Sequence, residues 1–253
     1  MTMFRKELLE IMRTKKFIIL IVVFLFVAFA SPALAKITPQ LLKNLPAESG
    51  ITINLPEPTW KDSIDQFIKN LSQVAILVLV FIFAGVIAEE KNKKTLEIVL
   101  TKPVSRTSFV SSKFLAAFTA TSIVYIVSAI IFYAYTLVIF GNFSFVNFSL
   151  LAILALVYLL FTVATAILCS TFTSNSVVAA FIAFGIQIII VSILGLIDQI
   201  KKYLPGNIFT NYKDVFSEIK PESYLPSALV TIAIIILCMI ISISIFRKQE
   251  IER

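Results

Sequence analysis

Residues 114–140 read FLAAFTATSIVYIVSAIIFYAYTLVIF, a run of 27 residues without one charged side chain. A helix needs about 20 mostly apolar residues to cross the hydrocarbon layer of a bilayer, which is about 30 Å thick. This run is longer than that, so it predicts a spanning helix that tilts or projects beyond the lipid. A strand of a membrane barrel would alternate apolar and polar residues, and this run does not alternate.

Five further uncharged runs lie elsewhere in the chain, so the sequence predicts six spanning helices. In chain order, the six predicted spans are residues 17–35, 71–88, 114–140, 148–170, 176–197 and 226–246. The composition agrees, since 58% of the residues are hydrophobic, 15% are charged and the mean hydropathy is +0.95. Soluble domains have about 25% charged residues, so a soluble protein is excluded. We predict one all-α integral membrane domain over residues 1–253.

The charged residues divide unequally between the two predicted sides of the membrane. No charge lies inside a predicted span, and the whole net charge of +7 falls on the side that carries both chain ends. The opposite side, which includes the predicted outer loops 36–70 and 198–223, sums to zero. The positive-inside rule therefore places both termini in the cytoplasm of a multi-pass plasma membrane protein. The basic charge indicates topology and contact with anionic lipid, not nucleic-acid binding.

The N-terminal residues precede the first span with a helical pattern of their own. Within residues 3–13, the side chains of Phe4, Leu8, Ile11 and Met12 share one stripe, and charged residues surround them. This pattern predicts an amphipathic helix in the membrane interface, with a solvated leader as the alternative. Residues 13–35 also match the regions of a cleavable signal peptide, but either outcome leaves the other five spans in the same orientation.

Local signals predict structure in the loops. The first half of loop 36–70 contains several prolines, which favour irregular structure. From Thr59 onward the sequence predicts a capped helix with Trp60, Ile64, Phe67 and Ile68 on one face, where Trp60 is expected to anchor at the membrane interface. Ser105 or Thr107 is expected to cap the helix that contains the third span. Pro205–Gly206 predicts a turn in the second outer loop.

The sequence indicates that the chain is not an enzyme. It contains no histidine, which removes histidine acid–base catalysis and the H-E-x-x-H zinc motif. The two cysteines, Cys169 and Cys238, lie within predicted spans, where packing is the expected role. The six glycines never form the phosphate loop G-x-x-x-x-G-K-[ST]. We therefore predict no catalytic residue, cofactor or metal in this chain.

The segment between the second and third spans carries the functional signal. Residues 88–115 read AEEKNKKTLEIVLTKPVSRTSFVSSKFL. They predict a short helix with Leu96, Val99 and Leu100 on one face, and Pro103 ends that helix. Because this apolar face lies outside the predicted lipid region, it indicates a docking element on the cytoplasmic side.

These residues resemble the coupling region of the permease subunits of type-two ABC exporters. Members of that family have an acidic residue leaving the second span, a Thr-Leu-Glu start to the coupling helix, a Pro-Val-Ser-Arg turn and a lysine entering the third span. The matching positions are Glu90, Thr95, Leu96, Glu97, Pro103, Val104, Ser105, Arg106 and Lys113. Lys94 departs from the pattern, because the family commonly has glycine there. The six-span layout, the N-terminal amphipathic helix and the large first outer loop extend the resemblance over nearly the whole chain.

The resemblance implies a role for these residues in ATP-driven export. It assigns coupling to the ATPase to Glu90, Thr95, Leu96, Glu97, Val99, Leu100, Pro103 and Arg106. It implies two cytosolic ABC ATPase subunits that bind ATP and Mg, together with a second permease copy or a paralogous permease, within membrane lipid. Energy would then enter this chain as a mechanical displacement of the coupling helix.

Two other functions stay open from the sequence. A gradient-driven secondary transporter usually carries ionisable residues within its spans, and the predicted spans here have none. Their polar residues, such as Gln187, Thr162, Thr165 and Ser170, are interpreted as helix–helix hydrogen bonds. Alternatively, the chain transmits ATP-driven movement to an extracytoplasmic partner protein. An uncharged membrane interior favours a hydrophobic or amphipathic cargo, and the substrate itself is not specified.

Overall fold

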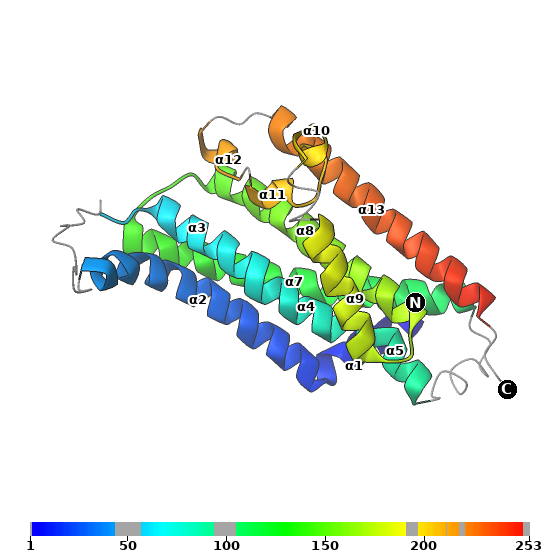
Figure 1. Cartoon of the computed structure of the whole chain (residues 1–253). Coiled ribbons are helices and arrows are strands. Elements are labelled where there is room, and N and C mark those ends of the chain that lie inside the picture. The colour runs from blue at the N-terminus through cyan, green and yellow to red at the C-terminus, as the bar shows by residue number, and fades with distance from the viewer. Residues whose placement is uncertain are drawn as a thin grey trace.

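The computed structural model of the chain describes residues 2–43, 57–93, 105–190, 197–210, 212–217 and 221–249 (Figure 1). All regular structure in these residues is helical. The long helices are α1 (Thr2–Arg13), α2 (Lys15–Lys43), α3 (Trp60–Asn70), α4 (Ile76–Phe83), α5 (Gly85–Asn92), α7 (Arg106–Phe140), α8 (Phe145–Phe172), α9 (Ser176–Ile188) and α13 (Pro221–Lys248). The shorter ones are the π-helix η1 (Leu71–Ala75), α10 (Asp198–Lys201), α11 (Asn207–Thr210) and α12 (Asp214–Ser217).

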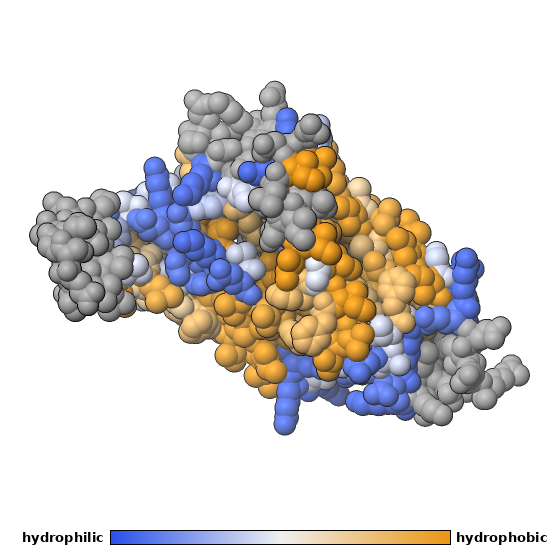
Figure 2. Space-filling view, in the orientation of Figure 1, coloured by the Kyte–Doolittle hydropathy of each residue, from blue (hydrophilic) through white to orange (hydrophobic). Residues whose placement is uncertain are grey.

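Two ends of the bundle can be distinguished. We call one the junction end, where α5, α8 and α13 end, α7 begins, and α1 packs against α7 (Figure 1). We call the other the loop end, where α3 begins and α10, α11 and α12 lie (Figure 1). Figure 2 shows hydrophilic residues at both ends and a continuous apolar band between them. Such a band, facing outward, is what a protein surrounded by lipid requires.

Five segments are long and apolar enough to cross a membrane, which makes the chain a multi-pass membrane protein. They are Lys15–Pro39, Trp60–Asn92, Arg106–Phe140, Phe145–Phe172 and Tyr224–Lys248. The predicted count of six full spans is not confirmed. In the predicted fifth span, α9 has 13 residues, about 20 Å at 1.5 Å per residue, and residues 191–196 lie outside the described ones.

The irregular structure predicted for the first half of loop 36–70 is not found in its first residues. The expected loop from residue 36 is helical as far as Lys43, and α2 contains both Pro32 and Pro39. Proline removes one backbone hydrogen bond, but ending a helix at membrane depth would expose several backbone groups that lipid cannot satisfy. α2 also packs along α3 and α7, where Phe24 and Val27 are fully buried. Burial of α2 continues as far as Ala35 and therefore offsets the cost of Pro32, whereas residues 36–38 are exposed.

The predicted helix after Thr59 is present, but it is not a separate loop element. Thr59 lies before its first turn and donates its backbone N–H to Asp62 Oδ2 at 2.7 Å. Ile64, Phe67 and Ile68 lie on one face as predicted, and that face is buried. α3 then continues through η1 into α4, so the second span is part of a longer helical rod than residues 71–88. η1 is a π-helix, a form that is often found at functional sites.

Several polar residues of the spans bond to a neighbouring helix, as predicted for Gln187, Thr165 and Ser170. Thr162 instead donates to the carbonyl of Tyr158 within α8. Gln187 Nε2 of α9 donates to Thr165 Oγ1 of α8 at 3.0 Å, and Tyr158 OH donates to Gln187 Oε1 at 3.1 Å. Ser128 of α7 donates to the carbonyl of Phe24 at 2.7 Å. Interhelical bonds of this kind are worth about 0.6–2 kcal/mol each in membrane proteins.

Candidate functional site

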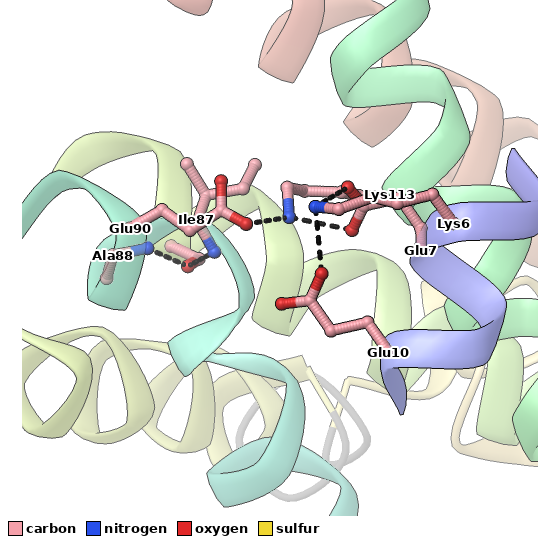
Figure 3. Close-up of polar contacts among 8 residues, drawn as sticks. Lys6, Glu7, Glu10, Ile87, Ala88, Glu90 and Lys113 are labelled. Atoms are coloured by element: carbon pink, nitrogen blue, oxygen red, sulfur yellow. Dashed lines mark hydrogen bonds and ion pairs between the residues drawn. The ribbon is translucent and has the colours of Figure 1, made fainter. Parts of the chain in front are cut away.

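A buried lysine at the junction end links three helices that are far apart in the sequence. Lys113 lies in the second turn of α7, and its side chain is 2% exposed. Its Nζ lies 2.9 Å from Glu7 Oε2 on α1 and 2.6 Å from Glu90 Oε1 on α5 (Figure 3). A buried cation without partners would be very costly, so these two carboxylates are what allow Lys113 to be buried.

Sequence reasoning missed the role of Glu7. It assigned Glu7 to the polar side of the N-terminal helix, whereas the residue is 3% exposed and faces the protein. The helical spacing held a signal, because Glu7 lies three residues after Phe4 and four before Ile11. It therefore shares their face, where a carboxylate needs a cationic partner. α1 is a helix, as predicted, and it packs mainly against α7.

Further ion pairs surround this contact on α1 and α2. Lys6 Nζ lies 3.1 Å from Glu7 Oε1 and 2.8 Å from Glu10 Oε2 (Figure 3). Partial burial opposes ionisation of Lys6, but the hydrogen bond to Glu10 and the charge of Glu7 outweigh it and raise the pKa of Lys6. Burial likewise opposes ionisation of Glu10, and the bond from Lys6 lowers the pKa of Glu10 overall. Lys16 of α2 also pairs with Glu89 of α5.

Arg106 ties the start of α7 to the end of α13. Ser105 is the N-cap residue, since its side chain accepts a hydrogen bond from the backbone N–H of Ser108 at 3.1 Å. Arg106 Nη1 donates to the carbonyls of Arg247 and Gln249, at 2.9 and 2.8 Å. The last carbonyls of a helix have no partner within it and carry partial negative charge, so a guanidinium stabilises them.

The C-terminal end of α8 also makes hydrogen bonds at the junction end. The carbonyl of Thr171 accepts hydrogen bonds from Lys91 Nζ at 2.5 Å and from Gln249 Nε2 at 2.9 Å. Ser170 Oγ accepts the backbone N–H groups of Ile87 and Ala88, both at 2.9 Å. These two donors lie in the first turn of α5, where a helix leaves its N–H groups unpaired. α5, α8 and α13 are therefore joined by polar contacts.

The charged residues line a cavity of about 410 Å³ between α1, α5 and α7. Its lining includes the carboxylates of Glu7, Glu10 and Glu90, whose oxygens lie within 4.8 Å of one another. Such a group would suit a metal ion by spacing alone. Here the ammonium groups of Lys113 and Lys6 lie among these carboxylates and offset most of their charge.

The structure places two of the eight residues predicted to couple to an ATPase. Glu90 and Arg106 both lie at the junction end, on α5 and α7, and each binds a different neighbouring helix. The other six, Thr95, Leu96, Glu97, Val99, Leu100 and Pro103, lie outside the described residues. The coupling helix therefore stays a prediction. Lys93 and Ser105, which flank it, both lie at the junction end.

Comparison with known proteins identifies the family. The model of a family described as "ABC-2 family transporter protein" matches residues 1–251. The chain is also similar to an uncharacterized transmembrane protein, YxlG, of Bacillus subtilis (strain 168). The two are 21% identical over 254 residues, which cover 99% of this chain and 98% of that protein. Since the family match extends over nearly the whole chain, this protein belongs to the ABC-2 family, the membrane permease subunits of ABC transporters.

Proposed function

We propose that the chain is the membrane subunit of an ATP-driven exporter, and that cytosolic ATPase subunits bind it at the junction end through residues 95–100. Two ATPase subunits would bind ATP and Mg, and a second permease copy or a paralogue would complete the membrane part. The single observation that carries this proposal is the network around Lys113, because it connects α1, α5 and α7 where the segment 94–104 begins and ends.

The network is suited to transmitting movement. A displacement of residues 94–104 acts on Lys93 at the end of α5 and on Ser105 at the start of α7. The hydrogen bonds of Lys113, Arg106 and Lys91 then transmit this displacement to α1, α13 and α8, respectively. Closely packed helices that share buried charges respond as units, since separating them would leave those charges unpaired. A push at the junction end would therefore tilt several spans together.

The proposal requires the junction end to face the cytoplasm, and cysteine labelling should test this orientation. In a variant in which Cys169 and Cys238 are replaced by alanine, single cysteines would be placed at Lys93, Glu57 and Lys202, all of which are exposed. We expect an impermeant thiol reagent to label positions 57 and 202 on intact cells, and position 93 only after lysis. Labelling of position 93 on intact cells would reverse the proposed orientation.

Co-purification tests the function itself. The full chain, tagged at its C-terminus and extracted in mild detergent, should retain a protein with an ATP-binding cassette, and the complex should hydrolyse ATP. The chain purified alone should not hydrolyse ATP. The same preparation from cells that lack the retained ATPase gene serves as the control. Transport or assembly that is unaffected by loss of every such ATPase would contradict the proposal.

A further inference from the structure

Two adjoining cavities lie at the loop end, far from the charged network of the junction end. The first has a volume of about 530 Å³ and lies between α3, η1, α8, α9 and α11. The second, of about 480 Å³, lies between the start of α3 and the α11–α12 region. Asp65 and Tyr212 line both cavities, so the two share a wall. Each volume falls within the range of about 300–1,000 Å³ that small-molecule sites occupy.

The first cavity combines apolar and polar walls. Ile68, Ile76, Phe184, Ile188 and Phe209 supply apolar surface. Lys69, Ser72 and Gln73 supply polar groups along α3 and η1. Figure 2 shows this side of α3 as a hydrophilic stripe that runs from the loop end into the apolar band. A polar stripe beside apolar walls, at the edge of the apolar band, matches a molecule that has a polar head and a hydrocarbon chain.

The second cavity has the chemistry of a cation site. Trp60 and Phe216 lie with ring centroids 5.3 Å apart, and Glu57, Asp62 and Asp65 line the same space. Two of the chain's own cations already lie close to aromatic rings that line this cavity. Lys61 Nζ lies 5.6 Å from the ring centre of Trp60, and Lys213 Nζ lies 5.8 Å from the ring centre of Tyr212. Aromatic faces together with carboxylates are the usual surroundings of a bound quaternary ammonium group.

Lys213 marks the position that a ligand's cation would take. Its Nζ lies 3.1 Å from Asp65 Oδ2, and its side chain is 69% exposed, so little holds it in place. Tyr212 also donates its hydroxyl to Asp65. Asp65 therefore presents a carboxylate at the boundary of the two cavities, next to an aromatic face and a lysine that an incoming cation can displace.

We infer that these two cavities form a binding site for an amphiphile with an ammonium head, whose head lies at Asp65, Trp60 and Tyr212 and whose hydrocarbon chain extends along the apolar wall formed by Ile76, Phe184 and Ile188. This goes beyond the proposed coupling function, because the site belongs to this chain alone and is measured without an ATPase. Failure of the binding experiment would leave the proposal for the junction end untouched.

Trp60 is the only tryptophan of the chain, so its fluorescence reports directly on the site. The full chain would be placed in phosphatidylglycerol nanodiscs, a membrane without ammonium headgroups. Decyltrimethylammonium is the probe, and decyl sulfate and decyl maltoside, with the same chain, are the controls for head charge. We expect a saturable change in Trp60 fluorescence with decyltrimethylammonium, and no saturable change with the other two. An equal response to all three heads would overturn the inference.

Variants with opposite expected effects make the test independent of folding. Asp65→Asn should weaken decyltrimethylammonium binding about tenfold, since a charged partner is lost, whereas Glu10→Gln at the junction end should not change it. Lys213→Met should strengthen binding about threefold by removing the competing cation. Lys202→Met removes an exposed charge from the same loop region without touching Asp65, and should have a smaller effect. Equal effects of the two lysine variants, or of the two acidic ones, would contradict the assignment.

Discussion

Replacing Lys113 with methionine is expected to lower the free energy of unfolding by about 3–5 kcal/mol, because it removes the cation that lies between the buried carboxylates of Glu7 and Glu90. Glu7 and Glu90 are 4% and 14% exposed, so water cannot replace the ammonium group. Methionine is similar to lysine in length, and the loss therefore reports on charge more than on packing. Thermal unfolding of the purified chain in detergent would measure the effect.

Two further variants separate the charge effect from general damage. Lys16→Met breaks the Lys16–Glu89 pair, both of whose side chains are 38% exposed, and should cost no more than about 1 kcal/mol. Combining Lys113→Met with Glu7→Leu and Glu90→Leu also removes the two buried carboxylates that Lys113 neutralises, and should restore much of the stability. A Lys113→Met variant as stable as Lys16→Met would show that the network does not hold α1, α5 and α7 together.

Leu96→Asp is expected to weaken binding of the ATPase by several kcal/mol without changing membrane insertion. If Leu96 inserts into a cleft on the ATPase, burial of its side chain contributes about 1.5–3 kcal/mol. Aspartate loses that contribution and adds the cost of desolvating a carboxylate. Residue 96 lies outside the predicted spans, so insertion should be normal. Pull-down of the ATPase at matched membrane expression measures the effect.

The same segment offers a matched control. On a helix, Ile98 lies about 200° around from Leu96, opposite the predicted apolar face. Ile98→Asp therefore makes a similar apolar-to-acidic change and should reduce ATPase binding much less. Glu97→Lys should weaken binding through charge reversal at the edge of the contact. Equal losses for Leu96→Asp and Ile98→Asp would indicate that the segment does not dock as a helix with one apolar face.

Much of this fold follows from local sequence. Uncharged runs mark the long helices, Ser105 caps α7 as its position predicts, and the buried face of α3 follows from its helical spacing. Gln187, Thr165 and Ser170 also bond to neighbouring helices as expected, since lipid offers them no alternative partners. These features depend on a residue and its near neighbours, which a single sequence displays directly.

The features that sequence reasoning missed depend on distant contacts. The Lys113–Glu7 pair joins residues 106 positions apart, and no local pattern specifies that pairing. The continuation of α2 through Pro32 accompanies its packing against α3 and α7, which local sequence does not specify. The π-helical turn in the second span also carries no local signal that separates it from ordinary spanning helix. The positions of Glu90 and Arg106 could be predicted, but their partners could not.

A photo-crosslink from residue 96 tests the central claim most directly. A photoreactive phenylalanine analogue would replace Leu96 in the full chain, in cells that also produce the ATPase, with the same analogue at the exposed Tyr203 of the loop end as control. We expect irradiation to join the chain to the ATPase from position 96 and not from position 203. A position 96 that crosslinks only to lipid or to another copy of this chain, while the ATPase is present and active, would contradict docking at the junction end.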